Sequence, residues 1–135
     1  MLELFCGIGG ASEAVGGATL SIDQSIPALQ VLRRHHATPT LCRNLMGIRA
    51  ETLPEAELWW LSPPCQPYTQ RGLQKDVEDP RSRPLLHILP WIRLRRPRRL
   101  ALENVPGFAE SQSRQLLLQA LEGYQVEEQI GRAHV

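Results

Sequence analysis

The chain has 135 residues, of which 42% are hydrophobic and 21% charged, a composition typical of one globular domain and unlike that of a disordered or fibrous protein. No apolar run approaches the roughly 18 residues that a membrane span needs, so we expect an intracellular, cytoplasmic protein with no membrane partner. The formal net charge of +1 points by itself to neither nucleic acid nor membrane. The three cysteines are too far apart for a CxxC metal pair, and we expect no metal site.

Short apolar runs alternate with helical patterns, and glycine or proline marks most of the boundaries. In chain order the predicted elements are strand Leu2–Phe5, helix Ala11–Val15, strand Thr19–Ile22, helix Pro27–His36, strand Thr40–Cys42, strand Leu58–Leu61, helix Pro84–Leu94, strand Leu100–Leu102 and helix Ser111–Leu121. This alternation predicts an α/β fold with a mainly parallel, doubly wound sheet. Ligands of such sheets bind at the carboxyl ends of the strands, so the residues that follow each strand are the candidates for function.

A glycine-rich segment, Gly7–Gly10 (GIGG), follows the first predicted strand. Glycines let a ligand approach the backbone closely, and Asp23, at the end of the second strand, is a carboxylate suited to a ribose diol. The same glycines are typical of a tight turn without a ligand, and a nicotinamide cofactor uses similar parts. The GxGG spacing favours a nucleoside cofactor that lacks a pyrophosphate.

Two reactive side chains follow the fourth and fifth strands. Cys65 lies in a turn stiffened by prolines, Ser62–Pro67 (SPPCQP), and Glu103 ends the fifth strand. A lone cysteine is usually a small buried hydrophobic residue, and an acid after a strand is commonly just its solvated end. Their shared place at the ligand edge instead favours a nucleophile and an acid that face one pocket. That pair suits attack on an electron-poor heterocycle whose ring nitrogen the acid binds or protonates.

Three segments of the sequence together resemble the cytosine carbon-5 methyltransferase family. Phe5–Gly10 (FCGIGG) is similar to its cofactor motif, Pro63–Pro67 (PPCQP) to its nucleophile motif and Glu103–Val105 (ENV) to its acid motif. The resemblance extends from Met1 to about Glu128, and Ser62–Pro80 looks like the branch that methylates a cytosine in tRNA anticodon loops. It implies a Rossmann-like methyltransferase fold that uses S-adenosyl-L-methionine to form 5-methylcytosine in DNA or tRNA.

The resemblance also implies a set of cofactor-binding residues. They are Phe5, Gly7, Gly9, Gly10, Asp23, Gln24, Asn44, Leu45 and Pro64. Within this set Asp23 would hold the ribose hydroxyls, and Gln24 would lie beside the adenine. Asn44 falls where the family often has an aspartate that accepts from the adenine amino group, and Leu45 would pack on the ring.

For the reaction itself the resemblance implies that Cys65 is the nucleophile and Glu103 the acid. The Cys65 thiolate would add to carbon-6 of a flipped-out cytosine while Glu103 engages nitrogen-3, which makes carbon-5 able to accept the methyl group. The remaining motif positions, expected to bind the substrate, are Gln66, Pro67, Asn104 and Val105.

Other features lie outside these motifs. We interpret Cys6 and Cys42 as core packing, and we expect the arginine-rich run Arg93–Arg99 to be a solvated connection at the sheet edge opposite the chemistry. The family has further motifs after Glu128 that are absent here, so residues 1–129 are interpreted as part of a truncated catalytic domain. Ile130–Val135 (IGRAHV) looks like a translated sequencing adapter and is interpreted as a non-native tail.

Two other functions remain open from the sequence. One is a catalytically inactive fragment that at most binds the cofactor, and the other is a nicotinamide-dependent oxidoreductase of the same fold class. Binding of S-adenosylhomocysteine or of NAD distinguishes the last from the methyltransferase interpretation. The oligomeric state is not constrained by the sequence.

Overall fold

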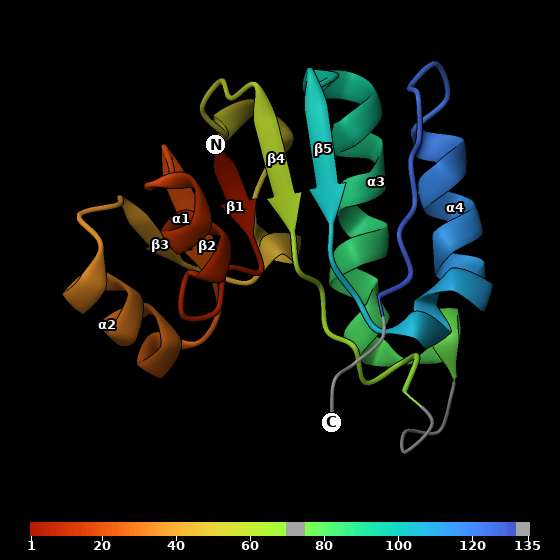
Figure 1. The fold of residues 1–135 in the computed structure, drawn as a ribbon, viewed down its shortest axis with the longest axis horizontal. Helices are drawn as coiled ribbons and strands as arrows, with labels where there is room; N and C mark the ends of the chain where they lie inside the picture. The colour runs from red at the N-terminus through yellow and green to blue at the C-terminus, as the bar shows by residue number, and fades with distance from the viewer. Residues whose placement is uncertain (70–74, 132–135) are drawn as a thin grey trace.

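A computed structural model describes residues 1–69 and 75–131 and shows a five-stranded sheet with helices packed against it (Figure 1). The strands are β1 (Leu2–Leu4), β2 (Leu20–Asp23), β3 (Thr40–Cys42), β4 (Leu58–Leu61) and β5 (Arg99–Leu102). The α-helices are α1 (Gly10–Val15), α2 (Ile26–His35), α3 (Arg83–Arg95) and α4 (Gln112–Ala120). Each element predicted from the sequence is therefore confirmed, with boundaries that shift by one or two residues.

The strand order is β3-β2-β1-β4-β5, and every neighbouring pair is parallel. After β1 the chain builds outward on one side through β2 and β3, and it then returns to the other side of β1 with β4 and β5. The strand order thus reverses between β1 and β4, and in open α/β sheets a ligand crevice forms at that point. The loops after β1 and β4 are the glycine segment and the Cys65 turn.

The main hydrophobic core lies between one face of the sheet and helices α3 and α4. Alternation along β1 directs Leu2 and Leu4 to this face, and both are fully buried. Trp59 and Leu61 of β4 join the same cluster, in which α3 contributes a stripe of apolar side chains. The stripe consists of Leu85, Ile88, Leu89, Trp91 and Ile92.

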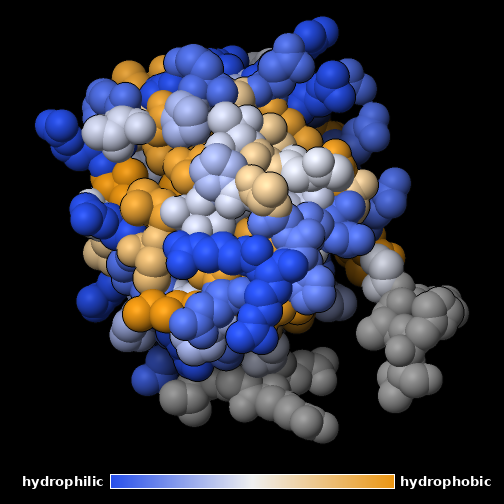
Figure 2. Space-filling view, turned by 90° about the vertical axis from the view of Figure 1, so that its left-hand side faces the viewer, coloured by the Kyte–Doolittle hydropathy of each residue, from blue (hydrophilic) through white to orange (hydrophobic). Residues whose placement is uncertain are grey.

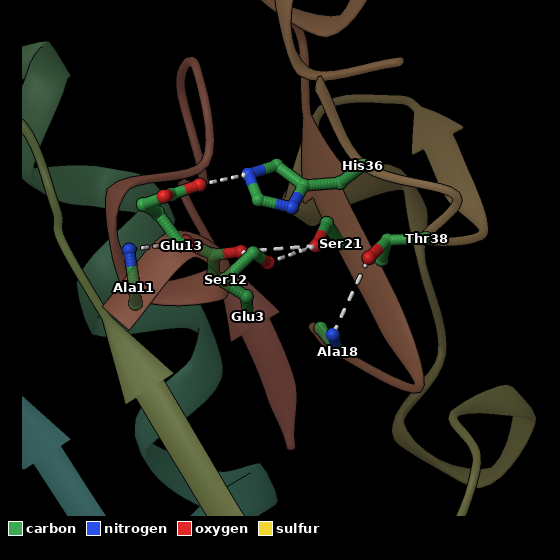
Figure 3. Close-up of polar contacts among 8 residues, drawn as sticks. All are labelled: Glu3, Ala11, Ser12, Glu13, Ala18, Ser21, His36 and Thr38. Atoms are coloured by element: carbon green, nitrogen blue, oxygen red, sulfur yellow. Dashed lines mark hydrogen bonds and ion pairs between the residues drawn. The ribbon is translucent and has the colours of Figure 1, made fainter. Parts of the chain in front are cut away.

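The opposite face of the sheet is polar where α1 crosses it. Glu3, between Leu2 and Leu4, is only 2% exposed, and its carboxylate accepts from the backbone nitrogen of Ala11 at 3.2 Å (Figure 3). The hydroxyls of Ser12 and Ser21 both donate to the second oxygen of Glu3, the latter at 3.0 Å (Figure 3). Gly9 provides no side-chain cap for α1, and this buried carboxylate instead accepts from one of the free backbone N–H groups of the first helical turn, that of Ala11.

A second small contact joins α1 to the end of α2. The ring of His36 lies 2.9 Å from the carboxylate of Glu13, and Thr38 accepts from the backbone nitrogen of Ala18 at 3.4 Å (Figure 3). The apolar side of α2 packs through Leu29 and Leu32, and these two residues form a separate cluster with Cys6. The interpretation of Cys6 as core packing is confirmed.

Two expectations about individual side chains were wrong. Cys42 is exposed rather than buried in the core, because β3 is an edge strand with α2 on one side only. In the arginine-rich run, Arg93, Arg96, Arg98 and Arg99 are exposed as expected, but Arg95 is only 15% exposed, and its Nη1 donates to the carbonyls of Ala50 and Leu53 at 2.7 and 3.1 Å. It also pairs with Glu55, so this arginine fastens α3 to the segment that precedes β4.

The side of the molecule formed by α2 and β3 is largely hydrophilic, with scattered apolar patches (Figure 2). Across the described parts of the chain, no helix combines the length and the hydropathy that a bilayer span needs. In residues 1–69 and 75–131 there is also no group of three His, Cys, Asp or Glu side chains that could hold a metal ion. Arg132–Val135, most of the tail interpreted as non-native, lies outside the described residues.

Candidate active site and cofactor site

The candidate residues converge because four strands end at the same level of the sheet. Leu4 is in register with Ile22 on one side and with Leu61 on the other, and Leu61 is in register with Leu102. The residues that follow these four positions therefore lie at one edge. They are Phe5, Asp23, Ser62 and Glu103.

The glycine loop after β1 turns sharply and leaves its backbone open. Phe5 and Gly7 adopt positive φ values of 59° and 51°, which ends the strand at Leu4. A Cβ atom added to Gly7 or Gly10 would meet nothing within 4 Å, whereas one on Gly9 would lie 2.9 Å from the Leu32 side chain. Gly9 is thus required for packing on α2, and Gly7 and Gly10 border open space in which a ligand can approach the main chain.

Asp23 holds this loop at the end of β2. Its Oδ2 accepts from the backbone nitrogen of Gly7 at 2.8 Å, and its Oδ1 accepts from that of Ser25 at 2.8 Å. A carboxylate oxygen has two lone pairs, so each oxygen can still accept from a ligand hydroxyl. The two backbone contacts fix the orientation of the carboxylate.

The side chains expected beside the adenine also meet. Asn44 Nδ2 donates to Gln24 Oε1 at 2.9 Å, and Asn44 Oδ1 accepts from the backbone nitrogen of Met46. Both Asn44 and Gln24 are exposed at the ends of β3 and β2. Leu45, by contrast, is only 3% exposed and packs in the main core.

The turn after β4 presents Cys65 at the same edge. Pro63 is buried, Pro64 and Cys65 are half-buried, and the Cys65 carbonyl accepts from the backbone nitrogen of Tyr68 at 2.9 Å. Gln66 points to solvent, whereas Pro67 is fully buried. The prolines and the closing hydrogen bond give the thiol a defined position.

Arg81 forms an ion pair with Asp79 in the stretch of chain that follows the Cys65 turn. Its Nε and Nη2 donate to the two carboxylate oxygens of Asp79 at 2.9 and 2.7 Å. These hydrogen bonds hold the pKa of Asp79 at about 2, and they raise the pKa of Arg81 above its usual value. The two oxygens of Asp79 bind two of the three guanidinium nitrogens of Arg81, whose side chain is half-exposed.

The acid turn lies directly beside the nucleophile turn. The backbone nitrogen of Glu103 donates to the Leu61 carbonyl at 3.0 Å, which continues the pairing of β5 with β4 by one residue. Asn104 Nδ2 then donates to the Pro63 carbonyl at 3.1 Å, while its Oδ1 accepts from the nitrogen of Val105. Glu103 is exposed and available to a ligand. The structure thus joins the two turns that carry the candidate nucleophile and acid.

Several residues that follow the Cys65 turn in the chain were not among the candidates from the sequence. Asp76, Asp79 and Arg81 lie in the polar stretch after Cys65, which has no clear periodicity. The pair Asp79-Pro80 was the available signal, because Asp accepts at a helix N-terminus and Pro fits the first turn that follows. Asp79 does cap the short 3₁₀ helix Pro80–Ser82 in this way.

Comparison with known proteins shows the family to which the chain belongs. The sequence profile described as C-5 cytosine-specific DNA methylase matches residues 1–134. This chain belongs to that family. The matched range includes all of the candidate site residues described above, from Phe5 to Val105.

Individual relatives in sequence and in structure are also named methyltransferases. A bovine protein named tRNA (cytosine(38)-C(5))-methyltransferase is 38% identical over 94% of this chain and 36% of its own length. The type II methyltransferase M.HgiCII of Herpetosiphon aurantiacus is 32% identical over 93% of this chain and 30% of its own length. The crystal structure of S. pombe Dnmt2 methyltransferase superimposes with a TM-score of 0.74 at 28% identity, covering 89% of this chain and 38% of that one. The chain spans about a third of the length of the relatives it matches.

Proposed function

We propose that this chain supplies the cofactor-binding and nucleophile-bearing part of an enzyme that forms 5-methylcytosine in nucleic acid. The observation that carries the proposal is the junction between the two turns, where Asn104 donates to the Pro63 carbonyl and sets Glu103 beside the segment that bears Cys65. A nucleophile and an acid on neighbouring strand ends suit addition to a pyrimidine ring. The open glycine loop lies at the adjacent switch point of the sheet.

The residues present fit S-adenosyl-L-methionine. Gly7 and Gly10 leave room for a ligand against the main chain, and Asp23 is an oriented acceptor for ribose hydroxyls. Phe5 and Gly9 shape the same loop. The family's motifs imply that Gln24, Asn44, Leu45 and Pro64 also border the cofactor, and the Asn44–Gln24 hydrogen bond supports this for the first two. When bound there, this cofactor supplies the methyl group.

The chain's own residues account for the remaining chemistry. The Cys65 thiolate forms a bond to carbon-6 of a cytosine, and the electron pair of the 5,6 double bond moves toward carbon-5 and nitrogen-3. Glu103 donates its carboxyl proton to nitrogen-3, which neutralises the charge that develops on the ring, and takes this proton back when the adduct breaks down. After carbon-5 is methylated, its proton leaves to water, the double bond re-forms and the Cys65–carbon-6 bond breaks. Gln66, Asn104 and Val105 flank these two groups and would border the base, whereas Pro67 is fully buried and would support the Cys65 turn from the core.

The cytosine would have to leave a stacked or paired position to reach both groups, so we propose that it binds flipped out. Mammalian relatives named for tRNA are 36–38% identical to this chain, whereas the S. pombe relative named for tRNA and the type II methyltransferase M.HgiCII are both 32% identical. We therefore take tRNA as the first substrate to test and DNA as the second.

Covalent trapping tests the proposal. The full chain is incubated with S-adenosylmethionine and with tRNA or DNA that contains 5-fluorocytosine, whose fluorine blocks release of the enzyme. We expect a denaturation-resistant adduct with the unaltered chain and with the matched control Cys42→Ser, and none with Cys65→Ala. An adduct that survives in Cys65→Ala contradicts the assignment of the nucleophile.

Cofactor titration by calorimetry tests the two alternatives. Binding of S-adenosylhomocysteine without any adduct on tRNA or DNA supports an inactive cofactor-binding fragment. Saturable binding of NAD without binding of S-adenosylhomocysteine supports an oxidoreductase and ends the methyltransferase proposal.

A further inference from the structure

Tyr68, three residues after Cys65, packs tightly against Gly107 and Phe108, which follow Glu103 in the chain. The ring of Tyr68 meets that of Phe108 edge to face, with centroids 5.0 Å apart, and both side chains are buried. A Cβ atom on Gly107 would lie 2.2 Å from the Tyr68 carbonyl oxygen, so only glycine permits this approach of the two backbones. These contacts join the chain just after Cys65 to the chain just after Glu103.

Asp76 lies eleven residues after Cys65 and contacts both the Cys65 turn and the start of α4. Its backbone nitrogen donates to the Pro67 carbonyl at 3.3 Å, which brings residue 76 back beside the Cys65 turn. Its carboxylate reaches the start of α4, where one oxygen accepts from the backbone nitrogen of Gln112. The other accepts from the nitrogen and the hydroxyl of Ser113 at 3.1 and 2.6 Å. Helix α4 follows the acid turn in the chain, so Asp76 links the nucleophile segment to the acid segment.

The α4 helix already has a local cap. Ser111 Oγ accepts from the backbone nitrogen of Arg114 at 3.0 Å, whereas Asp76 binds the two preceding N–H groups that Ser111 leaves free. Asp76 also adopts φ of +48°, a conformation that costs free energy in any residue but glycine and that Asp and Asn tolerate best. The charge-assisted bonds to α4 hold it there.

We propose that Asp76 is a positioning residue for the Cys65 nucleophile, which it holds in register with Glu103 by anchoring the Cys65 segment to the start of α4. The inference rests on the function proposed above. It assigns to Asp76 no contact with cofactor or substrate. Loss of the anchor would displace the thiol relative to the acid, and misplacement of a reacting group by about 1 Å can cost on the order of a hundredfold in rate.

Three variants of the full chain separate anchoring from simple stability. Asp76→Gly accepts the positive φ but loses the carboxylate, and Asp76→Asn accepts the same φ and keeps one acceptor oxygen. Ser111→Ala removes the local cap of the same helix and leaves Asp76 in place. The thermal midpoint is measured for each variant, so that effects on the reaction are compared at matched stability.

The main readout is the maximal rate of adduct formation with 5-fluorocytosine nucleic acid, separated from the half-saturating concentration. We expect Asp76→Gly to lower the maximal rate at least about tenfold with unchanged S-adenosylhomocysteine affinity, and Asp76→Asn to recover part of the loss. Ser111→Ala should leave the rate unchanged although its thermal midpoint falls. Equal slowing by Ser111→Ala and Asp76→Gly overturns the inference, as does an unaltered rate in Asp76→Gly.

A second readout decides the inference even if the unaltered chain forms no adduct, which would count against the proposed function alone. The rate at which iodoacetamide alkylates Cys65 is followed by peptide mass spectrometry. Release of the anchor should expose the half-buried thiol, so Cys65 should react several-fold faster in Asp76→Gly than in Ser111→Ala or the unaltered chain. The same rate in all three chains overturns the inference.

Discussion

The carboxylate of Asp23 accepts a hydrogen bond of 2.8 Å from the backbone nitrogen of Gly7, sixteen residues earlier in the chain. This bond ties the end of β2 to the glycine loop after β1, and a second bond from Ser25 fixes the other carboxylate oxygen. The candidate ribose acceptor is therefore also the group that shapes the loop against which the cofactor would lie.

Replacement of Asp23 by Asn tests this double role. An amide offers one acceptor oxygen, so either Gly7 or Ser25 would face the NH₂ group, and we expect a loss of about 1–2 kcal/mol in the free energy of unfolding. Calorimetry should show S-adenosylhomocysteine binding weakened by about tenfold, equivalent to about 1.4 kcal/mol. Ser25→Ala is the control, because it removes the α2 cap at a cost of about 1 kcal/mol and keeps the backbone donor. Equal loss of binding in both variants would contradict the role of Asp23.

Glu3→Gln probes the buried polar cluster under α1. The carboxylate accepts from Ala11, Ser12 and Ser21, and an amide would leave at least one of these buried donors unsatisfied. Urea denaturation should show a loss of about 2–3 kcal/mol, against about 1 kcal/mol for Ser12→Ala, which removes only one donor. A Ser12→Ala variant as unstable as Glu3→Gln would show that the cluster does not depend on the carboxylate.

The three cysteines should differ in reactivity in the native chain. Burial, with smaller contributions from Asp23 and Glu3, raises the pKa of Cys6 to about 12 from 9.0, so this thiol stays protonated at pH 8. Alkylation followed by peptide mapping should modify Cys42 and Cys65 and leave Cys6 unmodified, whereas all three should react in urea. Modification of native Cys6 as fast as Cys42 would contradict its burial and its packing role.

The Asp79–Arg81 pair should contribute to stability in a defined pH range. Hydrogen bonds from Arg81 lower the pKa of Asp79 from 3.8 to about 2, so the stabilisation is complete above pH 3.8 and is lost as the pH falls through about 2. In Arg81→Gln the pKa of Asp79 should return toward 3.8, and stability should depend less on pH in that interval. Denaturation curves collected from pH 5 to pH 2 compare the two chains, and parallel pH dependences would exclude this linkage.

Local patterns in the sequence determined most of the fold. Short, mostly apolar runs with glycine or proline near their ends predicted the strands. The alternation of these strands with helices predicted the parallel sheet. Because parallel strands end at a common edge, the sequence also placed Gly7, Asp23, Cys65 and Glu103 on one side of the molecule. These inferences need only the periodicity of short segments and a general rule about sheets.

The tertiary structure alone decided which side chains meet across that edge. Cys42 has a strand pattern like that of a core residue, yet it is exposed because β3 lies at the edge of the sheet. Glu3 is a charged residue between two apolar residues of β1, a pattern that predicts exposure. It is nevertheless buried, because α1 covers that face of the sheet and supplies hydrogen-bond donors to the carboxylate. The anchoring of Asp76 to α4 joins residues more than thirty positions apart. Such contacts depend on strand order and helix placement, which the period of a short segment does not encode.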